Sequence, residues 1–106
     1  MQTDKLDDIR RARASTGRLY EEFLRRPSMS AGLYELPAGS TDPQQPHTED
    51  ELYHVIAGRA TFECGGERRA IGPDDTIFVE AHAQHRFVDI TQGLSVLVVF
   101  APAESG

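Results

Sequence analysis

The side chains best suited to chemistry gather in one short, acidic stretch in the middle of the chain. Gln45, His47, Glu51 and Tyr53 all stand at odd positions, so in an extended chain they project from the same face. His85 lies much further along and shares the parity of the strand-like residues that follow it. Two imidazoles and one carboxylate on a rigid scaffold can bind a divalent metal ion and leave coordination positions open. These residue types indicate a metal centre.

The first of the elements that must position these side chains is expected to be helical. Residues 1–26 carry seven basic and five acidic side chains, whereas residues 27–106 carry four and twelve. Four apolar side chains within Leu19–Leu24 follow an i, i+1, i+4, i+5 stripe, which is typical of an amphipathic helix. Pro27 ends such a helix because the residue before proline avoids the α region. We therefore expect a helical segment over 1–26 that packs on its own domain or on a second subunit.

Beyond Pro27 the apolar pattern changes to a period of two, which predicts strands. Turn-forming clusters of glycine, proline and aspartate separate the apolar runs, and Gly65-Gly66 is a good two-residue hairpin signal. Seven or more short strands with no helix between them exclude a parallel βαβ fold and leave a sandwich, jelly roll or small barrel over residues 27–106. Six of the expected strands lie at Met29–Leu33, Leu52–Ile56, Ala60–Cys64, Thr76–Val79, Phe87–Ile90 and Leu94–Phe100.

Composition excludes several classes of function. The chain has 106 residues and a net charge of -6, so it has room for one domain and the wrong sign of charge for a nucleic-acid partner. No apolar run approaches the length of a membrane span. The single cysteine, Cys64, cannot form an internal disulfide and has no charge partner that would activate it. Because residues 1–26 lack the apolar core of a secretory signal, we expect a cytoplasmic protein.

Two stretches of the sequence carry a resemblance to a known family. The first contains Pro37-Ala38-Gly39, then His47, Glu51 and Gly58; the second runs from Gly72 to His85. Together they resemble the two motifs of the cupin superfamily. This resemblance implies an all-β, jelly-roll β-barrel, usually dimeric, that holds a divalent metal ion.

The resemblance also implies roles for individual residues. His47, Glu51 and His85 fall on ligand positions, and Gln45 takes the place of a further histidine. Gln45 is therefore a candidate fourth ligand through its amide oxygen, which is a weaker ligand than imidazole. The donor set would accept Fe, Mn, Ni, Co or Zn.

Each candidate ligand also has a simpler interpretation. His47 could be an exposed loop histidine, Glu51 a solvated carboxylate and His85 the cap of a strand. Their places in the motifs favour the metal for all three. His54 has the opposite parity to Glu51 and is expected on the outer surface, and His82 is expected in an exposed loop.

The candidate ligands favour a metal-dependent enzyme that acts on a small polar molecule. Dioxygenase-like chemistry is preferred to isomerase or lyase chemistry, with Tyr53 as a proton donor or orienting hydroxyl. A non-catalytic module that binds a metal or small ligand remains an alternative, as does a purely structural barrel. We expect a homodimer with no nucleic-acid or membrane partner, in which the N-terminal helix or the strand at Met29–Leu36 contributes to the interface.

Overall fold

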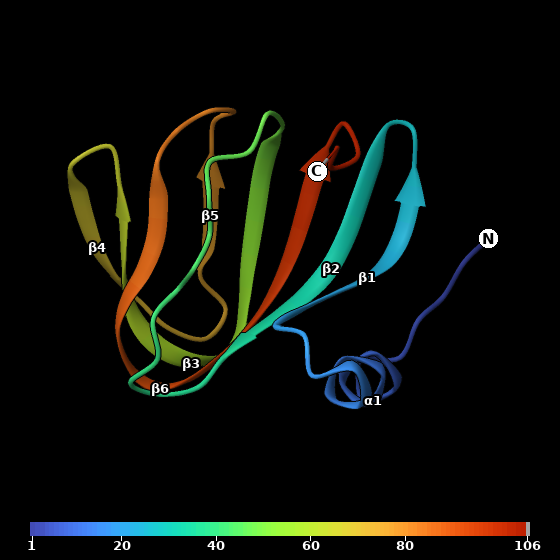
Figure 1. Ribbon diagram of the computed structural model, residues 1–106, viewed down its shortest axis with the longest axis horizontal. Helices are drawn as coiled ribbons and strands as arrows, with labels where there is room; N and C mark the ends of the chain where they lie inside the picture. Colours follow the sequence, from blue (N-terminus) through green and yellow to red (C-terminus); the bar gives the residue numbers. More distant parts are fainter. Residues whose placement is uncertain (106) are drawn as a thin grey trace.

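The computed structural model describes residues 1–105, which form one helix followed by six β-strands (Figure 1). The all-β prediction, with a short helical segment at the N-terminus, is confirmed. No helix in this part of the chain is long and apolar enough to cross a membrane. The elements are α1 (Leu6–Thr16), β1 (Tyr20–Arg26), β2 (Met29–Leu36), β3 (Asp50–Cys64), β4 (Glu67–Ile71), β5 (Thr76–Val79) and β6 (His85–Ala101).

The strands form one antiparallel sheet that curls around its own core. Its order is β1-β2-β6-β3-β4, and β5 pairs with the first half of β3. In Figure 1 the long strands β3 and β6 cross the lower edge of the molecule and rise on both sides of it. Helix α1 lies beside the sheet, where Arg10 and Arg13 form ion pairs with Glu35 of β2.

The predicted helix over Leu19–Leu24 is wrong. Helix α1 ends earlier, at Gly17, whose φ of 72° places it in the left-handed region that favours glycine. Residues Tyr20–Arg26 are instead strand β1, paired with β2, and a register shift between Glu22 and Leu24 marks a β-bulge. A bulge inserts one extra residue and so breaks the period of two. The apolar side chains of this strand therefore imitate a helical stripe.

Two pairs of predicted strands are each one continuous strand, and two observed strands, β1 and β4, lie at none of the expected positions. The structure therefore has six strands in residues 1–105 instead of seven or more. The runs at Leu52–Ile56 and Ala60–Cys64 are the two halves of β3, and those at Phe87–Ile90 and Leu94–Phe100 belong to β6. Irregular register between Val55 and Thr61 marks the bend that joins the halves of β3.

Glycine makes this bend possible. Gly58 has a φ of 97°, and a Cβ placed on it would lie 2.3 Å from the carbonyl oxygen of Gly93 on β6. No side chain fits between two backbones that approach so closely. The β3–β6 ladder can therefore fold over at this point and enclose a core.

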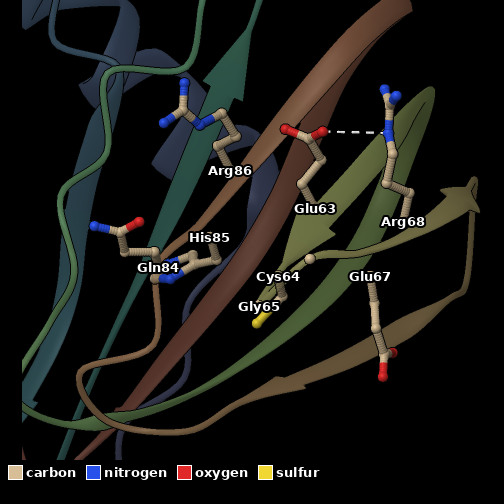
Figure 2. Close-up of a pocket in the computed structure, with 9 residues that line it drawn as sticks. Glu63, Cys64, Gly65, Glu67, Arg68, Gln84, His85 and Arg86 are labelled. Carbon is tan, nitrogen blue, oxygen red and sulfur yellow. Dashed lines mark ion pairs between the residues drawn. The ribbon is translucent and has the colours of Figure 1, made fainter.

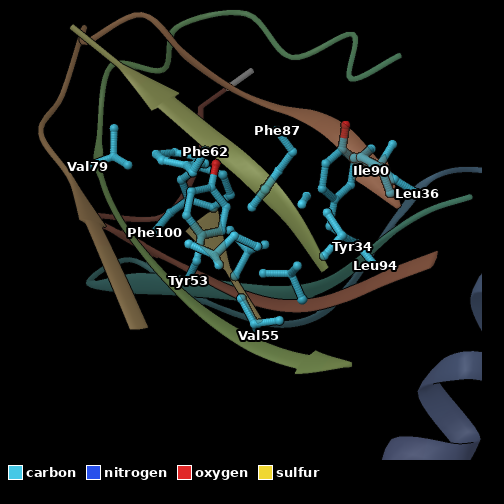
Figure 3. Close-up of a cluster of buried hydrophobic side chains, with 14 residues drawn as sticks. Tyr34, Leu36, Tyr53, Val55, Phe62, Val79, Phe87, Ile90, Leu94 and Phe100 are labelled. Carbon is cyan, nitrogen blue, oxygen red and sulfur yellow. The ribbon is translucent and has the colours of Figure 1, made fainter. Parts of the chain in front are cut away.

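Aromatic side chains from both halves of the folded ladder fill that core (Figure 3). Phe87 packs edge to face on Phe62 and Tyr53, with ring centroids 4.9 and 5.3 Å away. Such contacts add about 0.5–1.5 kcal/mol each to the area that they bury. The rigid core thus lies directly beneath the polar residues described next.

Candidate metal centre

His47, Glu51 and His85 converge in the structure. One potential ligand atom from each residue lies within 4.8 Å of those of the other two. Glu51 is the second residue of β3 and His85 the first residue of β6, whereas His47 lies in the irregular segment before β3. The alternation of β3 turns Glu51 inward together with Tyr53 and Val55, and all three are buried.

The bend in the β3–β6 ladder explains how residues from its opposite ends meet. Glu51 pairs with Phe100 at one end of the ladder, and His85 pairs with Cys64 at the other. A flat ladder would separate the two ends by roughly 40 Å, at about 3.3 Å per residue. In the folded ladder, Nε2 of His85 lies 3.0 Å from Oε1 of Glu51.

Both histidines direct the same ring nitrogen toward Glu51. Nδ1 of His85 lies 2.7 Å from the carbonyl oxygen of Ala83, and Nδ1 of His47 lies 3.1 Å from Oε2 of Glu104. If each Nδ1–H donates to its neighbour, Nε2 of each ring carries the lone pair that a metal ion needs. Nε2 of His47 lies 3.8 Å from Oε1 of Glu51. Metal-binding histidines are held by such a carbonyl or carboxylate at the second nitrogen.

Oε2 of Glu51 and Nε2 of His85 are buried and form no hydrogen bond within residues 1–105. Nε2 has only an ion-pair contact, with Oε1 of Glu51 at 3.0 Å, and that contact requires a protonated imidazole. Each such atom costs about 1–3 kcal/mol, and the side chains of both residues are only 1 % exposed. A divalent cation would satisfy both atoms at once. The donor set, two neutral imidazoles and a carboxylate, therefore fits a resident metal ion.

The charge of His85 reflects the same environment. Burial by itself lowers the pKa of its imidazole, but the adjacent Glu51 carboxylate and the Ala83 carbonyl outweigh burial, so that the pKa is raised. In the metal-free protein His85 would thus favour a proton on Nε2, whereas a metal ion would require a lone pair on the same atom.

Gln45 does not join this cluster of side chains. Its side chain is exposed, and residues 41–47 form no strand, so the parity that predicted its direction does not apply there. The neighbouring Gln44 faces inward instead, and its Oε1 accepts a hydrogen bond of 2.8 Å from the hydroxyl of Tyr53.

Tyr53 lies beneath the centre and is fully buried. Burial, together with the negative charge of Glu51, raises the pKa of its phenol well above the usual value. Its hydroxyl therefore stays protonated and donates to Gln44.

Two carboxylates that sequence reasoning missed support the site. Buried Asp42 accepts hydrogen bonds from the Tyr34 hydroxyl at 2.5 Å and from the Phe87 backbone N–H at 2.9 Å. It thereby ties the irregular segment before β3 to β2 and β6. Glu104 reaches His47 from the polar C-terminal residues. No local pattern distinguishes either residue from a solvated loop carboxylate.

A cavity of about 230 Å³ lies against His47. Its walls are mostly apolar, and Gln44, Glu104 and the hydroxyl of Tyr20 add polar atoms; none of the described residues that line it is a lysine or arginine. The Tyr20 hydroxyl is buried without a hydrogen-bond partner in residues 1–105. Burial and the nearby Glu104 carboxylate raise its pKa, so it remains a proton donor.

A larger hollow, of about 450 Å³, lies at the end of the β3–β4 hairpin (Figure 2). Four of the nine residues that line it are charged, and two of them, Glu63 and Arg68, form an ion pair at 3.2 Å. His85 touches this hollow, but its Nε2 is directed at Glu51. Burial, Glu67 and Glu80 raise the pKa of Cys64 here, which favours an unreactive thiol. Both hollows touch one histidine whose Nε2 is directed at Glu51. The cavity at His47 differs from the larger hollow in its mostly apolar walls and in the Tyr20 hydroxyl that lacks a hydrogen-bond partner in residues 1–105, which favours it as a ligand cavity.

The remaining histidines lie where parity and loop position predicted. His54 faces outward on β3, with Nε2 3.7 Å from Asp74, and the His82 side chain is exposed. The backbone N–H of His82 donates to the carbonyl oxygen of His47 at 2.6 Å. The loop before β6 thus helps to hold the His47 segment.

Comparisons with known proteins agree with this architecture. The family model described as "Cupin domain" matches residues 32–100. The chain is 43 % identical over 105 residues, 99 % of this chain and 100 % of the other, to the uncharacterized protein SCO3923 of Streptomyces coelicolor. The chain therefore belongs to the cupin family, and the predicted jelly-roll barrel is confirmed.

Solved structures resemble it at lower identity. A candidate mannose-6-phosphate isomerase of Ralstonia eutropha is 25 % identical with a TM-score of 0.69, covering 79 % of this chain and 83 % of the other. An RmlC-like cupin from Shewanella frigidimarina is 19 % identical with a TM-score of 0.72, covering 79 % and 75 %. DMSP lyase DddQ from Ruegeria pomeroyi is 22 % identical with a TM-score of 0.70, covering 95 % and 66 %. The last two show the fold alone.

Proposed function

We propose that this cupin is a metal-dependent enzyme and that its substrate is a small polar molecule bound in the cavity beside His47. The observation that carries the proposal is the pair of buried atoms that form no hydrogen bond in the described chain, Nε2 of His85 and Oε2 of Glu51. Natural proteins keep such costly groups chiefly at functional sites.

Three ligands on one side of a metal leave positions for substrate or dioxygen. A bound divalent ion would polarise a substrate oxygen, and iron(II) would also support oxygen chemistry. Dioxygenase-like chemistry is the preferred reaction because two histidines and one glutamate are the donor set of the non-haem iron oxygenases. The metal is one of Fe, Mn, Ni, Co or Zn.

The cavity limits the substrate. Its volume of about 230 Å³ is below the usual range of about 300–1,000 Å³ for ligand pockets, so the substrate is small. A divalent ion would be balanced by Glu51 and Glu104, and no arginine or lysine among the described lining residues offers the bidentate or point-charge contacts that phosphates need. An uncharged polar molecule suits this cavity better than a phosphate ester.

Isomerase or lyase chemistry is the second candidate. Tyr20 and Glu104 both line the cavity and both can carry a proton, since burial raises the pKa of each. The similarity to a candidate mannose-6-phosphate isomerase supports the same class. A module that binds a metal or small ligand without turnover remains the non-catalytic alternative.

Elemental analysis of protein purified without a metal-binding tag tests whether the protein binds a metal ion, on which both candidate reactions depend. We expect about one transition metal ion per chain; wild-type protein that retains none and binds none when supplied overturns the proposal. Oxygen consumption by iron(II)-loaded protein, measured across a panel of small uncharged alcohols, diols and amides, then separates the reactions. Dioxygenase chemistry requires substrate-dependent oxygen uptake that His85→Ala abolishes, whereas turnover without oxygen uptake favours the isomerase or lyase.

A further inference from the structure

The end of the chain returns to the proposed metal centre. After β6, residues 103 and 104 form hydrogen bonds with Arg25, Pro27 and Ser30 at the turn between β1 and β2. Oε2 of Glu104 lies 3.1 Å from Nδ1 of His47. We infer that Glu104 is a positioning residue for the metal ligand His47, and that these C-terminal residues are thus part of the site. This inference rests on the proposed function, because it assigns a role toward the same metal.

His47 needs such support more than the other two ligands do. Glu51 and His85 project from the paired strands β3 and β6, whereas His47 lies in a segment without regular structure. A strand fixes the direction of its side chains, and an irregular segment does not. The ring of His47 does pack edge to face on Phe100, with centroids 4.9 Å apart. An apolar contact of this kind cannot choose which ring nitrogen keeps the proton.

Glu104 supplies that choice. If Glu104 accepts a hydrogen bond from Nδ1–H, whose nitrogen is 3.1 Å from Oε2, then Nε2 of His47 keeps the lone pair, and Nε2 is the nitrogen 3.8 Å from Glu51. Glu104 itself is not among the residues whose ligand atoms converge within 4.8 Å. It therefore acts on the metal through His47, as the carboxylate does in carboxylate–histidine–metal triads.

The backbone of Glu104 is held on both sides, which fixes the direction of its side chain. Its N–H donates to Oγ of buried Ser30 at 3.0 Å, and its carbonyl oxygen accepts from Nη2 of Arg25 at 2.6 Å. The next residue, Ser105, donates to Oε2 of Glu49 at 2.7 Å. These contacts come from β1, β2 and the segment before β3, so the tail is anchored at three separate places.

The experiment compares metal affinity in Glu104→Ala, Glu104→Gln and the charge-matched control Glu67→Ala, whose carboxylate lies on exposed β4. The dissociation constants of Zn²⁺ and Mn²⁺ are measured by competition with a chelating dye. We expect Glu104→Ala to weaken binding roughly 10- to 100-fold, the usual effect of losing an outer partner of a ligand. Glu104→Gln keeps an oxygen acceptor and should lose less, and Glu67→Ala should stay within about twofold.

A second measurement reports the mechanism directly. Nitrogen-15 NMR of the imidazoles in metal-free protein, at about pH 8 where histidine is ordinarily neutral, reports which ring nitrogen carries the proton. Wild-type protein should show His47 protonated at Nδ1, and Glu104→Ala should show a mixture of tautomers. Glu104→Gln should lie between the two, because its amide can either accept from Nδ1–H or donate to Nδ1. A merely structural loss would lower the melting temperature without mixing the tautomers.

The outcomes separate the two proposals. Glu104→Ala with wild-type affinity and an unmixed Nδ1–H tautomer overturns the role of Glu104, even if the wild type binds metal. Wild-type protein that binds no metal overturns the proposed function, and the tautomer measurement then still tests whether Glu104 sets the state of His47. If Glu104→Ala does not fold, Glu104→Gln decides. Its amide can donate as well as accept, so metal binding should weaken and the tautomers of His47 should mix in part, and wild-type affinity with an unmixed Nδ1–H tautomer would overturn the role of Glu104.

Discussion

Replacing Glu51 by glutamine should separate metal binding from folding. The side chain of Glu51 is 1 % exposed, with one oxygen 3.0 Å from Nε2 of His85 and the other without a hydrogen-bond partner in residues 1–105. Glutamine has nearly the same shape, carries no charge and can donate an N–H to the lone pair of His85. We therefore expect Glu51→Gln to lose the metal while the metal-free protein keeps its stability.

The expected magnitudes follow from these contacts. Removing a buried carboxylate oxygen that has no partner recovers about 1–3 kcal/mol, and losing the charged contact with His85 costs about 1.5–3 kcal/mol. The two nearly cancel, so the free energy of unfolding without metal should change by about 1 kcal/mol or less. A metal ion at 100 times its Kd stabilises the wild type by about 2.7 kcal/mol, which raises Tm by roughly 10–20 °C for a domain of this size.

Thermal unfolding followed by circular dichroism, with and without added Zn²⁺ or Mn²⁺, measures both quantities. Glu67→Gln is the matched control, because it removes an exposed carboxylate of β4 and should keep the full metal-dependent rise in Tm. A metal-dependent rise that persists in Glu51→Gln would refute the assignment of Glu51 as a ligand. A loss of more than about 3 kcal/mol without metal would show instead that the carboxylate is structural.

Four further predictions follow from the fold and the site. All three tyrosines of the chain have raised pKa values, mainly through burial. The folded state thus favours the protonated phenols, and the stability that this contributes is fully present below the unfolded pKa of about 10 and is lost as pH rises above it. Absorbance at alkaline pH should therefore show tyrosinate only as the protein unfolds, and native ionisation near pH 10 would contradict the burial. Gly66→Ala, at a φ of 86° in open space, should lower the free energy of unfolding by about 1–2 kcal/mol. Gly58→Ala should lower it by about 1–3 kcal/mol more, because the added Cβ meets the backbone of Gly93. Equal denaturant midpoints for the two variants would refute the close approach at the bend. His54→Ala and His82→Ala should retain metal that His47→Ala and His85→Ala lose, and the reverse result in elemental analysis would exclude the assigned ligands. The homodimer stays a prediction, which sedimentation at tens of micromolar tests and a monomer there would contradict.

Residues on regular strands were predictable from the sequence, and residues elsewhere were less so. The inward direction of Glu51, Tyr53 and Val55 follows from strict alternation along β3, and the structure buries all three. The same rule fails for Gln45, because the chain around it is not a strand. It fails again in β1, where a bulge between Glu22 and Leu24 shifts the alternation and imitates a helix.

The sequence by itself determined the all-β class, the family and the three residues that could hold a metal, since these depend on local periodicity and on residue types at set spacings. Only the tertiary structure decided that the three side chains meet. That outcome depends on the bend at Gly58, which folds the two ends of the β3–β6 ladder toward each other. Oε1 of Glu51 at one end then lies 3.0 Å from Nε2 of His85 at the other. Glu104 reaches His47 only because residues 102–105 pack against β1 and β2. Contacts between residues so far apart in the chain arise from packing and loop closure, which no local pattern encodes.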